Sequence, residues 1–180
     1  MSGLRVLSEG RWPGPGDRSL PPVPGFSASS FNPLVAETAE RCLRAYHGPP
    51  GAPGYGPSRT ALLLTSSGGD RGTALAIDTA AASDRRVPPL LFFQSNPNAV
   101  LGHIAARWQL TGPVVAVSPA DAVPGEVPPD ALELAELLLA DGDADQVLVI
   151  AAETVTATET VTAAESTATD RAVAVLVAFA

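Results

Sequence analysis

The chain has 180 residues, 46% of them hydrophobic, and this suffices for a packed core without disulfides or structural metals. All 11 basic residues are arginine and the chain has one cysteine, which excludes lysine-dependent chemistry, an internal disulfide and a Cys-rich metal site. Residues 1–120 carry 10 Arg and 7 acids, a balance of +3, whereas residues 121–180 carry 1 Arg and 12 acids, a balance of −11. Such an acidic second part argues against nucleic-acid binding.

The sequence shows neither a membrane span nor a secretory signal. No apolar run reaches the ~18–20 residues of a membrane span, and the first ten residues contain no secretory signal. We therefore expect a cytoplasmic protein that does not contact a membrane.

Residues 1–31 form a proline- and glycine-rich segment that precedes the main domain, residues 32–180. Its only candidate strand is Leu4–Ser8, and the prolines that follow favour a covering loop over a polyproline ligand. Asn32 and Pro33 then provide an N-cap and a first-turn proline for a helix that ends near Tyr46. One face of this helix carries the residues expected in the core: Val35, Ala39, Cys42 and Tyr46.

The cysteine and the first histidine are interpreted as structural residues. Cys42 lies far from the start of its helix, where the dipole could lower a thiol pKa, and no histidine shares its face. His47 ends the same helix, where a cationic side chain interacts favourably with the last carbonyl groups.

A buried strand over Thr60–Thr65 leads into the loop Ser66–Gly72 and an alanine-rich helix over Thr73–Ser83. A glycine loop before a helix can hold a phosphate. This loop lacks the glycine spacing and the lysine of known phosphate loops, so an ordinary strand-to-helix turn is the preferred interpretation and phosphate binding stays open.

The stretch from Phe92 to Asp121 organises the rest of the chain. A strand is predicted over Leu90–Phe93, followed by a helix with Asn96 and Pro97 at its start. The helix presents one apolar face: Val100, Leu101, Ile104, Ala105 and Trp108. After a Gly-Pro break, Val114–Val117 is a short β-branched run typical of a central strand.

The last third of the chain continues the alternation of helices and strands. Asp130 and Glu133 predict a capping box for a helix over Ala131–Ala140 that buries Ala131, Leu134, Leu137 and Leu138. Gln146–Ala152 is an apolar strand, and alternating threonines over 154–162 favour a strand or extended arm, although a flexible linker also fits. Arg171–Ala180 is a buried terminal strand, so the whole is an α/β layered domain.

Two ordered segments of this sequence resemble β-ketoacyl synthases of the thiolase-like family. The first, NAVLGHIA followed by LTGP and a strand, matches the run that leads to the Ala-Cys pair of the nucleophile, and here Ala120 and Asp121 occupy that pair. The second, which ends at Glu153, looks like the segment that usually ends Gly-Gly-Ala-Glu. The resemblance implies one half of a thiolase-like fold, a mixed sheet layered with helices.

The same resemblance implies that this chain lacks the synthase machinery. The family needs a thiolate and, in its second half, two His residues (or His and Asn), whereas this sequence has only His47 and His103, both before Asp121. An aspartate nucleophile is disfavoured because an acyl anhydride hydrolyses readily and a carboxylate repels an anionic malonyl donor. We expect no cofactor and no metal.

The resulting expectation is a catalytically incomplete partner or scaffold in bacterial type II polyketide or fatty-acid-type biosynthesis, similar to a chain length factor. Its partner would be a ketosynthase-like protein or a second copy, bound through the interface strand Val114, Val115, Ala116 and Val117, and possible contact with an acyl carrier protein follows from the family. The alternative is a small enzyme that hydrolyses, isomerises or cyclises a carrier-bound acyl chain with His103 or Asp121 as the acid or base.

Overall fold

A computed structural model describes residues 3–56, 59–83, 86–155 and 169–180. In this part of the chain, five strands form one sheet in the order β1-β5-β4-β2-β3. They are β1 (Leu4–Trp12), β2 (Thr60–Thr65), β3 (Val114–Val117), β4 (Gln146–Glu153) and β5 (Arg171–Phe179). Strands β2, β3 and β4 run parallel, whereas β5 is antiparallel to both β4 and β1. The sheet is therefore mixed. Strand β3 lies at one edge, so the prediction of a central strand over Val114–Val117 is wrong for this chain.

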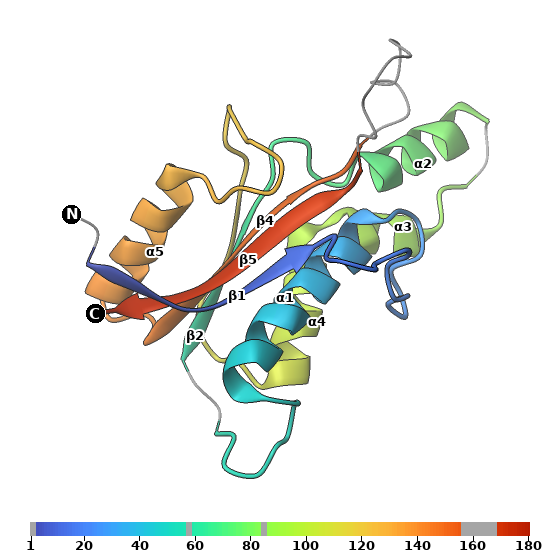
Figure 1. The fold of residues 1–180 in the computed structure, drawn as a ribbon. Helices are drawn as coiled ribbons and strands as arrows, with labels where there is room; N and C mark the ends of the chain where they lie inside the picture. Colours follow the sequence, from blue (N-terminus) through green and yellow to red (C-terminus); the bar gives the residue numbers. More distant parts are fainter. Residues whose placement is uncertain (1–2, 57–58, 84–85, 156–168) are drawn as a thin grey trace.

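Helices cover both faces of this sheet, as Figure 1 shows. Helices α1 (Phe31–His47) and α4 (Pro97–Trp108) pack on one face, and α5 (Pro129–Ala140) packs on the other. Strand β2 lies between them: Leu62 and Leu64 join the core under α1 and α4, and Ala61 and Leu63 join the core under α5. A strand that is buried on both faces must be apolar throughout, which explains the run Ala-Leu-Leu-Leu.

The first strand is longer than the sequence indicated. It reaches Trp12 and pairs with β5 along its whole length, with a bulge between Val6 and Ser8. Helix α1 crosses this strand at Gly10, where a Cβ atom would lie 2.6 Å from both Cys42 N and Thr38 O. The absence of a side chain at Gly10 therefore lets α1 approach the strand closely.

The predicted strand over Leu90–Phe93 is wrong, because these residues belong to helix α3 (Pro89–Ser95). Pro89 occupies the first helical position, where its fixed φ and missing N–H favour a helix start. A run of four apolar residues does not distinguish a strand from a buried helix turn. In the structure α3 packs against α2 (Arg71–Ala82) and α4, and Phe92 and Phe93 stay more than half exposed.

Helix α5 forms at the predicted place with a different buried face. Ala131, Ala135 and Leu139 face the sheet, whereas Leu137 is 59% exposed. Leu134 and Leu138, which were predicted to be buried, are partly buried and pack against the same core. The predicted capping box is also wrong, because the N-cap is Pro128 and no side chain caps this helix.

The predicted strand or extended arm over 154–162 lies mostly outside the described residues. Strand β4 ends at Glu153, and residues 156–168 lie outside the described residues.

Candidate functional site

The carboxyl ends of β2 and β3 form a corner with a pocket of about 270 Å³. Loop 66–70 leaves β2 at this corner, and residues 118–121 leave β3 beside it. The carboxyl ends of parallel strands are where open α/β sheets usually bind ligands. The pocket is lined by Phe31, Asn32, Leu64, Ser66, Ser67, Gly68, Gly69, Asp70, Gln94, Ser95, Pro97, Ala116, Val117 and Ser118. We call it the corner pocket.

A buried polar network forms one wall of the corner pocket. Asp70 caps α2 by accepting from Thr73 N at 2.9 Å, and it also accepts from Ser29 Oγ at 2.6 Å and from Asn32 Nδ2 at 3.1 Å. Asn32 Nδ2 donates a second bond to the Gln94 carbonyl at 3.0 Å. Asn32 therefore lies inside α1 and links this helix to Asp70 and to Gln94. The prediction that Asn32 caps α1 is wrong, since the N-cap is Ser30.

The glycine loop at this corner binds a carboxylate of the chain itself. Glu153, the last residue of β4, accepts hydrogen bonds from Ser67 N at 2.6 Å and from Gly68 N at 3.2 Å. Gly69 N donates to Ser66 Oγ at 2.9 Å. Because these amides already have acceptors, the loop is an internal turn that holds Glu153, and it offers no phosphate cradle.

Asp121 lies beyond the end of β3 and is exposed. Ser118, Pro119 and Ala120 separate it from the strand, and the next helix, α5, begins only at Pro129. A thiol is commonly activated by the N-terminus of a helix. No helix starts at this position of the chain, so Asp121 does not cap a following helix.

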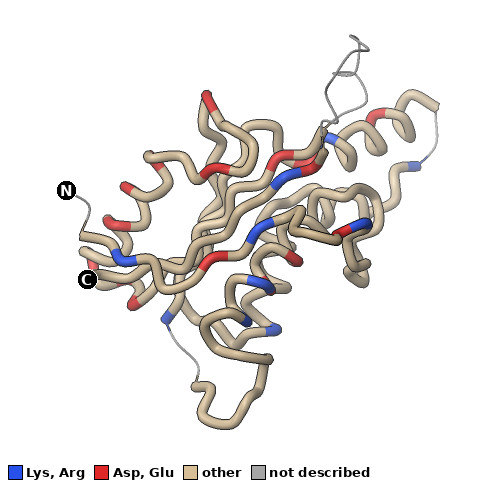
Figure 2. Tube along the Cα trace, in the orientation of Figure 1, with Lys and Arg blue, Asp and Glu red and all other residues tan. Residues whose placement is uncertain are grey.

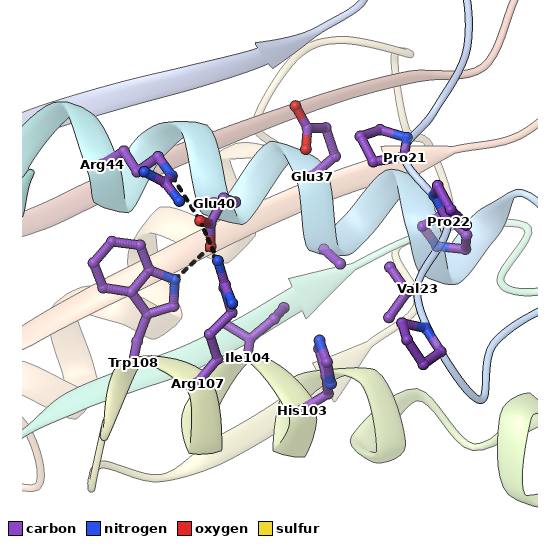
Figure 3. Close-up of a pocket in the computed structure, with 13 residues that line it drawn as sticks. Pro21, Pro22, Val23, Glu37, Glu40, Arg44, His103, Ile104, Arg107 and Trp108 are labelled. Atoms are coloured by element: carbon purple, nitrogen blue, oxygen red, sulfur yellow. Dashed lines mark hydrogen bonds and ion pairs between the residues drawn. The ribbon is translucent and has the colours of Figure 1, made fainter. Parts of the chain in front are cut away.

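His103 lies in a different cavity, a groove of about 540 Å³ between α1 and α4 (Figure 3). Pro21, Pro22 and Val23 form one end of this groove, and Trp108 lies at the other. The His103 ring packs edge-on against Phe26, with ring centroids 5.9 Å apart. The groove that His103 lines does not include Asp121, so the two candidate acid–base residues do not share it.

The strongest electrostatic feature of this groove is Glu40. Its carboxylate accepts from Arg44 Nε at 2.7 Å, Arg107 Nε at 2.9 Å and Trp108 Nε1 at 2.8 Å, as Figure 3 shows. Burial acts to raise the pKa of Glu40, but hydrogen bonds from Arg107, Trp108 and Arg44 outweigh it and lower the pKa to about 2. Glu40 is therefore a permanent anion that ties α4 to α1, unsuited to exchanging protons near neutral pH.

The only cysteine of the chain, Cys42, is buried. Cys42 lies between α1 and β1, with its Sγ 3.4 Å from Ser8 Oγ. Burial raises the pKa of the Cys42 thiol, and the hydrogen bond with Ser8 offsets this only in part. His47 lies at the end of α1 among aromatic rings, 5.0 Å from Tyr55 and 6.2 Å from Trp108 between centroids, and burial lowers its pKa.

Strand β3 presents an open edge. Leu62 N donates to Pro113 O at 2.8 Å and Ser66 N to Val117 O at 3.2 Å, so alternate residues of this segment bond to β2. In a parallel ladder the residues between them, Val114 and Ala116, direct their N–H and C=O groups away from β2. No described strand pairs with that outer edge.

Two of these features have a signal in the sequence that our prediction missed. Asp70 precedes Thr73 by three residues at the start of a helix, which is the spacing of an N-cap. Glu40 lies four residues before Arg44, which predicts an ion pair but not the bonds to Arg107 and Trp108, because those depend on how α4 docks.

Two negative findings, on metal sites and on membrane-spanning helices, hold for the residues that the structure describes. No cluster of three or more His, Cys, Asp or Glu side chains there could hold a metal ion. None of the described helices combines the length and the apolar composition needed to cross a membrane.

Comparison with known proteins gives matches among solved structures alone. No protein-family profile and no curated protein sequence matches the chain. A ketosynthase (ApeO) in complex with its chain length factor (ApeC) from Xenorhabdus doucetiae aligns with a TM-score of 0.69 and 17% identity, over 98% of this chain and 79% of that one. The ishigamide ketosynthase/chain length factor aligns with a TM-score of 0.69 and 20% identity, over 92% of this chain and 49% of that one.

A β-ketoacyl synthase from Burkholderia phymatum STM815 also aligns, with a TM-score of 0.69 and 16% identity, over 100% of this chain and 60% of that one. The chain thus spans about half to four fifths of these structures. Its mixed five-stranded sheet with helices has the fold of a thiolase-like ketosynthase half-domain, and the resemblance predicted from the sequence is confirmed at the level of the fold.

Proposed function

We propose that this chain is a catalytically incomplete ketosynthase-like protein that acts as the partner of a β-ketoacyl synthase in polyketide or fatty-acid-type biosynthesis. One observation carries the proposal: the segment after β3 has Asp121 where the synthase pattern has its cysteine, and the only cysteine of the chain is buried elsewhere. The fold likeness to structures of a ketosynthase with a chain length factor supports a partner role by analogy.

The chemistry of condensation supports the loss of activity. A condensing enzyme forms a thioester, for which it needs an accessible thiolate. Burial raises the pKa of the Cys42 thiol, and its position between α1 and β1 keeps substrates away from the sulfur. Asp121 is exposed and carries a charge that repels an anionic donor.

The open edge of β3 supports the mode of association. The outward N–H and C=O groups of Val114 and Ala116 can pair with a strand of another chain, which is how exposed sheet edges commonly associate. Val114 is 38% exposed, and Phe92 and Phe93 of α3 add exposed apolar surface on the α4 side of the sheet. We assign Val114–Val117 as the contact strand, with a ketosynthase as the preferred partner and a second copy as the other. Contact with an acyl carrier protein would follow from that assembly.

The test is co-expression of the tagged chain with a cysteine-bearing β-ketoacyl synthase from the same source, followed by affinity purification and mass measurement. We expect a stoichiometric complex. Ala116→Pro removes an N–H that points away from β2, so it should abolish the complex and leave the monomer folded. Asp121→Ala is the matched control and should leave the complex intact. A clean monomer at working concentration, with the synthase present, would overturn the proposal.

The second candidate function is turnover of a carrier-bound acyl chain by His103 or Asp121. Incubation with acyl and malonyl carrier-protein substrates tests it directly. Turnover that is lost in His103→Ala or Asp121→Ala would replace the partner role with an enzymatic one.

A further inference from the structure

The corner pocket contains a buried hydrogen-bond acceptor with no described partner. Asn32 is 2% exposed, and its Oδ1 accepts no hydrogen bond from the described residues. The orientation of this amide is fixed, because Nδ2 donates to two acceptors, Asp70 Oδ2 at 3.1 Å and the Gln94 carbonyl at 3.0 Å. Oδ1 is therefore the carbonyl oxygen, and an unmet buried acceptor costs about 1–3 kcal/mol.

The remaining walls of the pocket combine apolar side chains with neutral polar groups. Phe31, Leu64 and Ala116 supply apolar surface on the α1 and α4 face of the sheet, and Ser67 and Ser118 also line the pocket. This composition, with few polar groups among apolar ones, is typical of small-molecule sites. At about 270 Å³ the pocket suits a compact ligand.

The carboxylate of Asp70 and the occupied amides of loop 66–70 disfavour an anion beside Asn32. The Arg71 guanidinium lies beside Gly68, next to Glu153. Asp70 lines the pocket, and its carboxylate already accepts four hydrogen bonds from Ser29, Asn32 and Thr73, so it is not free to bind a ligand. The loop amides that could hold a phosphate or carboxylate donate to Glu153 instead. A ligand must therefore bring a donor, and it must not bring a negative charge.

We propose that the corner pocket is a binding site for a small neutral molecule that has a short alkyl chain and an N–H or O–H donor, which the Asn32 Oδ1 oxygen accepts. The alkyl chain lies against Phe31, Leu64 and Ala116. This site does not depend on the partner role, because it lies within one chain and needs no second protein.

The test is an NMR titration of the full-length, ¹⁵N-labelled chain with hexanamide, compared with N,N-dimethylhexanamide and with hexanoate. Hexanamide should shift the amides of residues 66–70 and 116–118. Dimethylation removes the donor, so it should weaken binding about tenfold, the effect of one lost hydrogen bond. Hexanoate should bind more weakly than hexanamide, because it has no N–H donor and its charge lies in a pocket lined by Asp70.

Two variants locate the site. Ala116→Leu and Ser118→Leu each add volume to a lining residue and should abolish the hexanamide shifts, and melting curves show whether each variant stays folded. Leu137→Ala, on the exposed side of α5, is the control and should bind as the parent does. Equal binding of the two amides, binding that a folded Leu variant retains, or no shift at the solubility limit of hexanamide would each overturn the proposal.

Discussion

The indole Nε1–H of Trp108 donates to Glu40 Oε2 at 2.8 Å, and this bond joins the last turn of α4 to the middle of α1. Arg107 adds two further bonds to the same carboxylate, at 2.9 and 3.0 Å. Figure 2 shows residues of both signs in the region of these two helices. Helix α4 is the element that precedes β3 in the chain. The Glu40 network therefore holds in place, against α1, the helix before the edge strand.

The Glu40 network should make stability depend on acid pH. The pKa of Glu40 is about 2 in the folded chain, below its ordinary value of 4.5, so its contribution is complete above pH 4.5 and is lost as pH falls toward 2. Because Arg44 and Arg107 are 46% and 48% exposed, solvent screens the network and we expect about 1 kcal/mol. Urea unfolding at pH 5 and at pH 2 measures this effect. Between these two pH values, the free energy of unfolding should fall by about 1 kcal/mol more in the parent than in Glu40→Gln.

The matched control is Glu37→Gln, one turn earlier on α1, whose carboxylate pairs with Arg41. This variant keeps the Glu40 network and should keep its acid sensitivity. Identical pH profiles for the parent and Glu40→Gln would show that the network adds nothing to stability.

Gly112 should be irreplaceable, because it brings β3 against β2. A Cβ atom there would lie 2.4 Å from Thr60 C and 2.5 Å from Ala61 N, both backbone atoms. Gly112→Ala must move the segment before β3, and we expect a loss of about 3 kcal/mol in the free energy of unfolding. The control is Gly102→Ala on α4, where a Cβ meets nothing within 4 Å and a gain of about 0.5–1 kcal/mol is expected. A folded, unperturbed Gly112→Ala protein would contradict the close approach seen here.

The thiol of Cys42 should be unreactive in the native state. Its sulfur is buried and its pKa is raised by that burial, so the thiolate fraction and the access of a reagent are both small. A colourimetric thiol reagent should modify the parent only after denaturation. Asp121→Cys places a second thiol at an exposed position and should add one equivalent that reacts at once. Rapid modification of the parent protein would show that α1 does not cover Cys42 as described.

The sequence predicted most elements of this fold because their residues satisfy local rules. Asn96 caps α4 by accepting from Asn98 N at 2.9 Å, and Pro97 begins that helix, both as predicted. Val100, Leu101 and Ile104 are buried with Trp108, as helical spacing indicated. These signals lie within one helix and need no knowledge of its neighbours.

The incorrect predictions all concern features that depend on tertiary packing. Leu90–Phe93 became a helix because no strand of the sheet lies next to them, and Leu137 became exposed because α5 approaches the sheet through its alanines. Tyr46, expected in the core, is 45% exposed and packs against His47 with 4.7 Å between ring centroids. For the same reason, the network of Asn32, Asp70 and Gln94 could not be predicted, since the chain order separates these residues widely.

The most direct test of the partner role is hydrogen exchange at the four amides of β3, with and without the β-ketoacyl synthase. In the isolated chain, the N–H groups of Val114 and Ala116 point away from β2 and should exchange quickly, whereas those of Val115 and Val117 should be protected. In the complex, we expect exchange at Val114 and Ala116 to slow about a hundredfold, because a partner strand accepts these bonds. Unchanged exchange at both amides in a complex of confirmed mass would contradict pairing through β3.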